Sequence, residues 1–351
     1  MPANLFEAVQ RVFLLIVLVF SFFIIITYVL SMGLGILILF STADGLVFSR
    51  GSILLNPFLI ADFEVNVNAG LYFLFLWWVF ALCFVAAWKY REELSDRIKD
   101  FFSGASERNP FTNNLLAMPV IASMLFVATI ILHTLQSQAG VPTGEPPISD
   151  SLLYFIMVSR APIVEEIVFR IVPIGAFLVT YISIVGGRTK HMLTLGGRLK
   201  MSVLSIVQPD KAKRLLGLKT IGENGFFGGG MTWGEWAMVF FTGLLFGIAH
   251  YFGGWGPGKI SQASLNGVIF ALTYLYYGVQ APILLHWYFN YYFTVFDLST
   301  PYYLTEIDIV SFSFLANLLL GILAWVMLIV LCLIMVLRKL RTGFAGSSVP
   351  L

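Results

Sequence analysis

The sequence predicts an all-α protein that crosses a membrane several times, and its composition is the first observation behind this prediction. Hydrophobic residues make up 58% of the 351 residues and charged residues only 11%, against roughly 25% charged residues in a typical soluble domain. The second observation is that the hydrophobic residues form long segments, several of which reach the roughly 20 residues that a helix needs to cross the hydrocarbon core. So few charges cannot cover the surface of a soluble domain.

Apolar segments can be marked along the whole chain, and we expect each to form one membrane-spanning helix. The eight segments are 12–40, 70–88, 114–135, 151–185, 233–253, 262–278, 281–298 and 309–337. The first is much longer than the roughly 7–15 apolar residues of a signal peptide, so we expect it to remain as a span. Cys83 and Cys332 are isolated in apolar segments, where we expect buried thiols rather than a disulfide framework.

Charge in the connecting segments predicts the orientation of these helices. Segment 188–219 has eight basic residues and a single acid, Asp210, and the C-terminal tail has three basic residues and no acid. Segments 136–150 and 299–308 each have two acids and no base. Because Lys and Arg concentrate on the cytoplasmic side, eight spans with both termini in the cytoplasm satisfy all of these biases, whereas seven spans do not. We therefore expect a multi-pass protein of a prokaryotic plasma membrane or of an endomembrane.

The longest connecting segment, 186–232, divides the chain into recognisable parts. We expect 1–149 to hold the first three spans, 150–298 a core of four spans with loop 186–232, and 299–351 the last span and a basic tail. The basic residues of this loop are typical of contact with anionic lipid headgroups, although a solvated linker fits equally well. Membrane lipids are thus expected partners, and the net charge of +2 gives no indication of nucleic acid.

Polar and charged side chains gather in three of the predicted spans. The fourth span contains Glu165, Glu166 and Arg170, the fifth contains Phe246 and His250, and the seventh contains His286 and Asn290. A charge deep in a bilayer costs at least about 2.5–3.5 kcal/mol on insertion scales, so such residues are functional candidates.

Spacing suggests how these side chains are arranged. Glu166 and Arg170 are four residues apart, as are His286 and Asn290, so each pair shares one face of its helix. Pro162 precedes the acids and is expected to kink the fourth span. Glu166–Arg170 could equally be a buried pair that only fixes helix packing. We interpret His133, near the end of the third span, as a packing residue of this kind.

Packing alone does not explain the set of Glu165, His250, His286 and Asn290. A carboxylate beside an imidazole can hold a water and remove its proton. An imidazole and an amide on another helix can stabilise the oxyanion of a tetrahedral intermediate. This combination suits attack of water on an amide without a protein nucleophile, and the sequence contains no G-x-S-x-G, H-E-x-x-H or G-x-G-D motif.

Three motifs in these spans resemble a known family. Glu165-Glu166-Ile-Val-Phe-Arg170 matches E-E-x-x-x-R, Phe246-Gly-Ile-Ala-His250 matches F-x-x-x-H, and His286-Trp-Tyr-Phe-Asn290 matches H-x-x-x-N. In this order they resemble the CAAX prenyl protease type II and bacteriocin-processing family of intramembrane glutamic endopeptidases. The resemblance covers about 150–297 and implies an eight-helix core around an intramembrane catalytic cavity.

The resemblance also implies roles for the residues. Glu165 and His250 would activate the water, and His286 and Asn290 would form the oxyanion site. Glu166, Arg170 and Phe246 occupy motif positions that support the catalytic residues. The substrate would be a protein or peptide, and prenylated proteins with a C-terminal CAAX sequence are the class that names the family.

Two other functions remain open at this stage. One is a zinc-dependent intramembrane metalloprotease with Glu165, His250 and His286 as ligands, although Asn is a poor zinc ligand and no Cys lies nearby. We therefore expect a mechanism without a cofactor. The other is a non-catalytic transporter or scaffold, against which the complete set of motifs argues. His250 and His286 lie at opposite ends of their spans, so they can meet only if the helices tilt, kink or start off-register.

Overall fold

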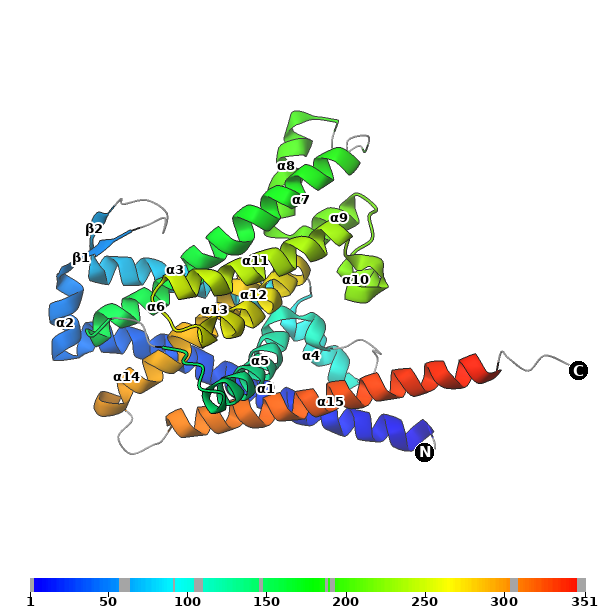
Figure 1. Cartoon of the computed structure of the whole chain (residues 1–351), viewed down its shortest axis with the longest axis horizontal. Coiled ribbons are helices and arrows are strands. Elements are labelled where there is room, and N and C mark those ends of the chain that lie inside the picture. Colours follow the sequence, from blue (N-terminus) through cyan, green and yellow to red (C-terminus); the bar gives the residue numbers. More distant parts are fainter. Residues whose placement is uncertain are drawn as a thin grey trace, which may run out of the picture.

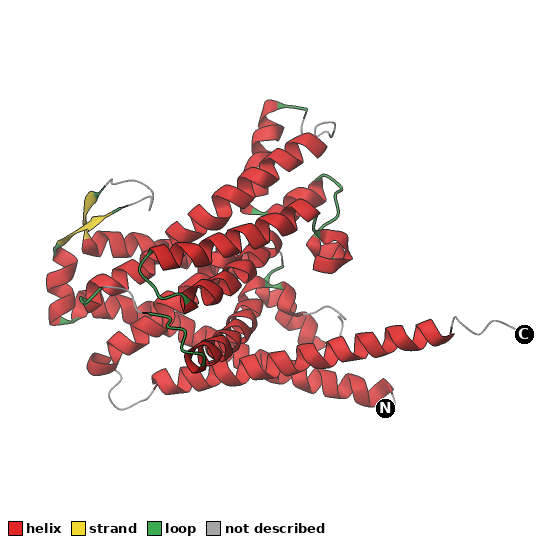
Figure 2. Cartoon of the chain, in the orientation of Figure 1, coloured by secondary structure: helices red, strands yellow, loops and turns green. Residues whose placement is uncertain are grey.

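The computed structural model describes residues 3–56, 64–90, 92–103, 110–144, 148–186, 189, 193–303 and 309–345. Nearly all of these residues are helical, which confirms the predicted all-α class (Figures 1 and 2). The sheet found in this part of the chain has two antiparallel strands, β1 (Ser52–Leu55) and β2 (Val65–Asn68), with Ser52 opposite Asn68. It forms a small hairpin at one end of the helix bundle.

Each of the eight predicted segments is helical. The helices are α1 (Ala3–Ser41), α3 (Ala69–Lys89), α5 (Asn114–Gln138), α6 (Ser151–Glu166) continued by η2 (Ile167–Ile171) and α7 (Val172–Val185), α11 (Trp233–Phe252), α12 (Gly258–Tyr277), α13 (Gln280–Trp287) continued by η5 (Tyr288–Tyr292) and α14 (Phe293–Tyr303), and α15 (Ile309–Ala345). Shorter elements connect them: α2 (Ala43–Arg50), α4 (Leu94–Ser103), η1 (Pro110–Thr112), α8 (Leu195–Val207), α9 (Pro209–Leu215), α10 (Ile221–Asn224) and η4 (Phe226–Gly230).

Six helical segments are long and apolar enough to cross a membrane, and they confirm an integral membrane protein. They are 11–41, 69–100, 114–138, 151–185, 233–252 and 309–334. Helices α12 and α13–α14 do not meet the same measure, so a total of eight spans stays a prediction. Every residue of α13 is buried. A helix enclosed by other helices does not touch lipid, and it can therefore carry polar residues such as Gln280 and His286 at the centre of the bundle.

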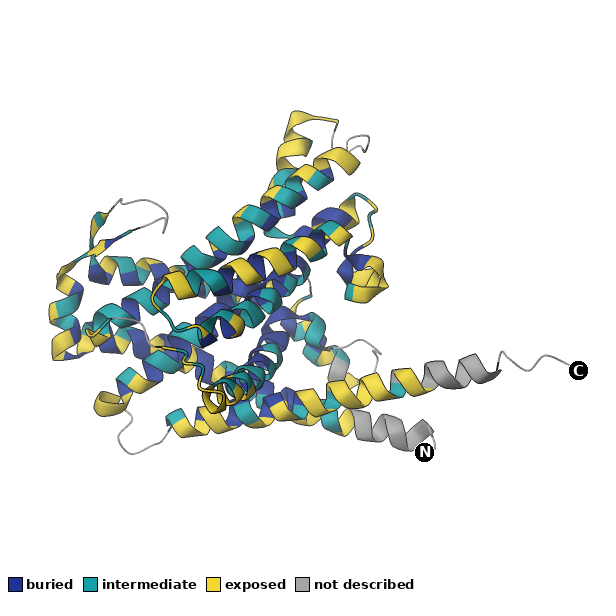
Figure 3. Ribbon diagram, viewed as in Figure 1, coloured by how far each residue is buried: buried dark blue, intermediate teal, exposed yellow. Residues whose placement is uncertain are grey.

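The core is built around this central helix. Trp287, Tyr288, Tyr291 and Tyr292 are each 0% exposed, and Tyr28 of α1 meets the Trp287 ring edge-on at 5.5 Å. The outer faces of α11 and α15 remain apolar and exposed, with Phe241 of α11 59% accessible. Figure 3 shows these exposed faces around the buried centre, as expected where lipid tails cover the protein.

Loop 186–232 is folded in the part that the structure describes. Helices α8, α9 and α10 contact α7 and α12, and the Tyr274 hydroxyl of α12 donates to the Ile206 carbonyl at 2.7 Å. The backbone N–H of Val279 donates to the Val207 carbonyl at 3.2 Å. The solvated-linker interpretation is therefore wrong for these residues, whereas contact with lipid headgroups stays a prediction.

A buried ion pair fastens this loop to the base of α11. Lys213 of α9 lies 3.0 Å from both carboxylate oxygens of Glu235, and the two side chains are 3% and 1% exposed. Breaking a buried pair by removing one partner typically costs about 3–5 kcal/mol, because the other charge stays buried. We expect Lys213→Met to lower the unfolding temperature clearly in a thermal melt. The exposed neighbour Lys211 provides the control, since Lys211→Met should change little; equal melting of both variants would contradict the assigned role.

The predicted orientation can be tested at Lys200, which is exposed on α8. Arg188 and Lys190 of the same basic segment lie outside the described residues, as do 304–308 of the acidic segment. We expect a cysteine at Lys200 to escape a membrane-impermeant thiol reagent added to intact cells and to react after the cells are opened. A cysteine at the exposed Ser137, at the end of α5, should behave in the opposite way. Labelling of the cysteine at position 200 in intact cells would show that the predicted orientation is inverted.

Candidate active site

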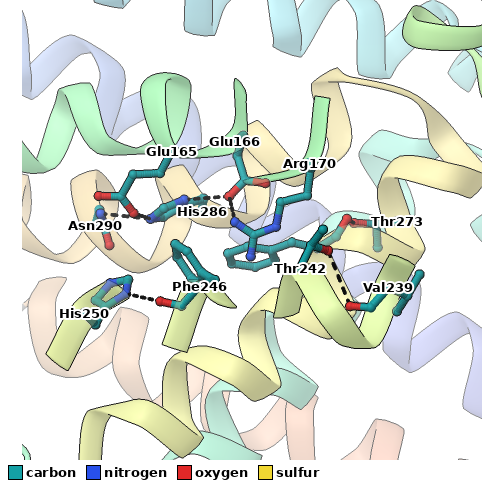
Figure 4. A network of polar contacts seen from close by, with 11 residues as sticks. Glu165, Glu166, Arg170, Val239, Thr242, Phe246, His250, Thr273, His286 and Asn290 are labelled. Carbon is teal, nitrogen blue, oxygen red and sulfur yellow. Dashed lines mark hydrogen bonds and ion pairs between the residues drawn. The ribbon is translucent and has the colours of Figure 1, made fainter. Parts of the chain in front are cut away.

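The seven residues singled out by the sequence motifs come together inside the helix bundle, as Figure 4 shows. They come from five elements: Glu165 and Glu166 from α6, Arg170 from η2, Phe246 and His250 from α11, His286 from α13, and Asn290 from η5. Segments that lie more than 100 residues apart in the chain therefore build one polar cluster inside the bundle.

Two π turns carry parts of this cluster. Ile167–Ile171 contains Arg170, and Tyr288–Tyr292 contains Asn290. The first π turn leads into Pro173, which has no N–H to continue the α-helical ladder. Such turns add a residue to one helical turn, and they are frequent at functional sites. Pro162 lies inside α6, so the irregularity predicted at this proline instead begins five residues later, at Ile167.

Glu166 is the fully buried anchor of the site. Its Oε1 accepts a hydrogen bond from Arg170 Nη1 at 3.1 Å and lies 2.8 Å from His286 Nδ1. Since a carboxylate can only accept, His286 Nδ1 carries a hydrogen in this contact. Both Glu166 and Arg170 are 0% exposed. The predicted pairing of Glu166 with Arg170 is confirmed, and the same carboxylate also orients His286.

Aromatic rings enclose the Arg170 guanidinium. Its central carbon lies 4.0 Å from the Phe246 ring centre and 5.4 Å from that of Phe270. A Cβ at Gly267 would come within 2.8 Å of Arg170 Nη2, so the guanidinium needs a residue without a side chain there. Neither Phe270 nor Gly267 belongs to a sequence motif, and both lie in the otherwise apolar sixth segment, so residue patterns alone do not indicate their role.

Glu165 has a different environment from its neighbour. Its side chain is 22% exposed, and its Oε2 lies 3.7 Å from His286 Nε2, with no hydrogen-bond partner among the described residues. Asn290 Nδ2 lies 3.2 Å from the same imidazole nitrogen. The two acids therefore flank one imidazole, with the fully buried Glu166 at Nδ1 and the partly exposed Glu165 at Nε2.

His250 approaches the cluster from α11. Its Nδ1 donates to the Phe246 carbonyl at 2.9 Å, which leaves Nε2 as an acceptor. The Phe246 ring lies between the two imidazoles, 4.6 Å from His250 and 5.6 Å from His286. The histidines that the sequence placed at opposite ends of their spans thus meet across this ring. No described contact joins Glu165 directly to His250, and the imidazole beside Glu165 is that of His286.

His133 lies outside this cluster. Its Nδ1 is 3.1 Å from the Thr143 hydroxyl and 3.4 Å from Gln262 Nε2 of α12. These contacts join α5 to α12, which agrees with its interpretation as a packing residue.

A cavity of about 420 Å³ opens beside the cluster. It is lined by Ile148, Ser149, Ser151, Tyr154, Phe293, Thr294, Asp297 and Leu298. The Thr294 hydroxyl donates to the Asn290 carbonyl at 2.6 Å, so the cavity begins one helical turn beyond Asn290. The start of α6 and the body of α14 lie at the end of the bundle opposite to loop 186–232 (Figure 1). Thr294 therefore connects the lining of the cavity to the helical turn that carries Asn290.

Comparison with protein families identifies the segment that contains the cluster. Residues 147–292 match the model of the family described as type II CAAX prenyl endopeptidase Rce1-like. This segment resembles the Rce1-like family. The match extends from just before α6 to the end of η5 and includes all seven residues of the cluster, which confirms the family expected from the three motifs. The Rce1-like segment supports, in general terms, a CAAX-type intramembrane protease. The chain matches no curated protein and no solved structure at a significant level.

Proposed function

We propose that this Rce1-like protein is an intramembrane endopeptidase in which Glu165 activates a water molecule for attack on a peptide bond. The contrast between the two acids carries this proposal. Glu166 is 0% exposed and its Oε1 is held by Arg170 and His286. Glu165 is 22% exposed and makes no hydrogen bond among the described residues; its nearest charged partner is His286 Nε2 at 3.7 Å. Only an accessible carboxylate with an unused lone pair can serve as the base for water.

The water would lie between Glu165 and His250. The Nε2 of His250 is free to accept a hydrogen bond from water, because Nδ1 is already committed to the Phe246 carbonyl. Glu165 then removes one proton while the oxygen forms a bond to the carbonyl carbon of the substrate. Arg170 does not touch the water in this scheme; its charge balances Glu166 and keeps the cluster assembled.

The opposite side of the substrate carbonyl would face Asn290 and His286. The Asn290 amide can donate to the oxyanion directly, and it lies 3.2 Å from His286 Nε2. His286 can donate there only when Nε2 carries a proton, and Glu165, 3.7 Å away, can pass on the proton taken from water. The same proton would go to the leaving amine as the C–N bond breaks, giving one carboxylic acid and one amine as products.

The proposed substrate is a peptide or protein that reaches the cavity within the membrane. Prenylated proteins with a C-terminal CAAX sequence are the substrate class that the family's description names. A prenyl chain adds about 0.8 kcal/mol of membrane affinity for each buried CH₂, and it would therefore concentrate such a substrate beside an intramembrane site.

A zinc mechanism would require several of these side chains to converge on one metal ion. No group of three or more His, Cys, Asp or Glu side chains in the described part of the chain is arranged to hold a metal ion. The Phe246 ring lies between the two imidazoles, 4.6 Å from His250 and 5.6 Å from His286. This donor geometry supports the metal-free proposal.

A cleavage assay on the purified full-length protein tests the proposal. The substrate is a fluorogenic peptide with a farnesylated cysteine four residues from its C-terminus. We expect hydrolysis in detergent that persists after prolonged treatment with EDTA and 1,10-phenanthroline. Loss of activity in chelator, followed by recovery on addition of Zn²⁺, would replace the glutamate mechanism by a metalloprotease mechanism.

A further inference from the structure

The loop between α11 and α12 returns directly to the catalytic cluster. The Trp255 N–H donates to the His250 carbonyl at 3.2 Å, and the Trp255 ring lies 6.3 Å from the His250 ring. Lys259, in the first turn of α12, places its Nζ 4.1 Å from the centre of the Trp255 ring. A cation is thus connected to the catalytic imidazole through one aromatic side chain.

Contacts with segment 141–144 hold this loop in place. Gly256 N–H donates to the Thr143 carbonyl at 2.7 Å, and Gly258 N–H donates to the Pro142 carbonyl at 2.9 Å. A Cβ at Gly256 would meet the Thr143 carbonyl carbon at 2.9 Å, so the two backbones approach too closely for a side chain. On the next turn, Gln136 Nε2 of α5 donates to the Gly258 carbonyl at 2.9 Å. Lys259 therefore extends from a fixed backbone rather than from a loose loop.

The Lys259 ammonium has an aromatic partner but no acid. None of the ion pairs between described residues involves Lys259, although its charge interacts electrostatically with Glu165 and His250. The side chain is half-buried. A partly desolvated cation on an aromatic ring retains N–H donors that are unused by the ring, and it gains most from a carboxylate that arrives with a ligand.

We propose that Lys259, positioned by Trp255, binds the C-terminal carboxylate of the substrate and so directs cleavage to peptide bonds near the end of a chain. This inference rests on the proposed endopeptidase function and specifies its substrate class. A series of contacts runs from His286, beside Glu165, through Phe246, His250 and Trp255 to Lys259. A few residues of extended peptide, at roughly 3.3–3.6 Å each, would follow this series from the scissile bond to the terminus.

Three matched peptides test the assignment on the purified full-length protein. The first is the farnesylated reporter with a free C-terminal carboxylate, the second is the same peptide with a C-terminal amide, and the third is the amide with Asp as its last residue. Since a hydrogen bond to a charged group contributes about 1.5–3 kcal/mol, we expect wild-type kcat/KM to be about 10–100-fold higher for the first peptide than for the second. Lys259→Met should remove this preference by slowing only the free acid.

Two further variants separate charge recognition from general damage. Lys259→Arg should keep a preference for the free acid, and Lys211→Met, a loss of charge on the exposed face of α9, should behave as wild type. The inference is overturned if the wild type cleaves the acid and the amide equally well, if Lys259→Met keeps the preference, or if the amidated Asp peptide is cleaved as fast as the free acid. If the wild type cleaves none of the peptides, the proposed proteolytic function fails instead.

Discussion

Replacement of Glu165 by Gln is expected to abolish cleavage while the protein stays folded. Gln keeps the shape of the side chain and removes the lone pair that takes the proton from water, and general-base catalysis contributes typically 10²–10⁴-fold. The fold should tolerate the change, because Glu165 is 22% exposed and its contact with His286 is 3.7 Å long. Turnover at saturating substrate and a thermal melt, measured on the same preparation, check both parts. Substantial turnover by a well-folded variant would eliminate the glutamate mechanism.

The adjacent acid supplies the matched control for this experiment. Glu166→Gln leaves Arg170 buried without its counter-ion, and such a loss typically costs about 3–5 kcal/mol. We expect this variant to melt at a clearly lower temperature than Glu165→Gln. Glu165→Gln would then lose turnover while keeping its melting temperature, whereas Glu166→Gln would lose thermal stability. If Glu165→Gln were the less stable of the two, the assigned roles would have to be exchanged.

Asn290→Ala is expected to lower kcat by about 10²–10³-fold, the usual cost of losing one oxyanion donor. The amide would contact the oxyanion only in the transition state, so KM should stay nearly unchanged. The alternative is a purely structural role, in which Asn290 only stabilises η5. Its carbonyl accepts a hydrogen bond from Thr294, and its amide lies beside His286. In that case the variant would lose thermal stability but keep turnover per folded molecule.

His250→Ala tests the activation of water from α11, the helix that carries His250. If His250 and Glu165 hold one water, the double variant Glu165→Gln/His250→Ala should be no slower than the more damaged single variant, since residues that act as a unit are strongly non-additive. Additive losses would show that His250 works independently of the water, as a residue that only supports Phe246.

The sequence contained enough information for the helical class and for the members of the polar cluster. Charge inside an apolar helix is costly wherever the helix packs, so Glu165, Glu166 and Arg170 were visible without any structure. The structure now shows these residues together with His250, His286 and Asn290. Helix spacing also predicted the contacts of Glu166 with Arg170 and of His286 with Asn290, because both are local to one helix.

The sequence did not reveal the contacts that depend on how helices pack. The predicted association of Glu165 with His250 has no direct contact in the structure, and His286 lies between the two acids instead. The π turns at 167–171 and 288–292 rotate their side chains by amounts that residue spacing does not encode. Phe270 and Gly267 look like ordinary residues of a helix, and their role beside Arg170 appears only when α12 is placed against η2.

The position of the cavity links the orientation of the protein to the leaflet from which its substrates are drawn. Helix α6–η2–α7 is continuous from Ser151 to Val185, with the cavity at its first turns and loop 186–232 after its last. If this loop is cytoplasmic, as its basic residues predict, the cavity faces the opposite leaflet, and the proposed protease would act on chains that have already been exported. With the loop outside, the cavity faces the leaflet that holds cytoplasmic lipid-modified C-termini. The labelling result at Lys200 therefore decides where the natural substrate should be sought: among exported peptides, or among proteins with lipid-modified C-termini at the cytoplasmic leaflet.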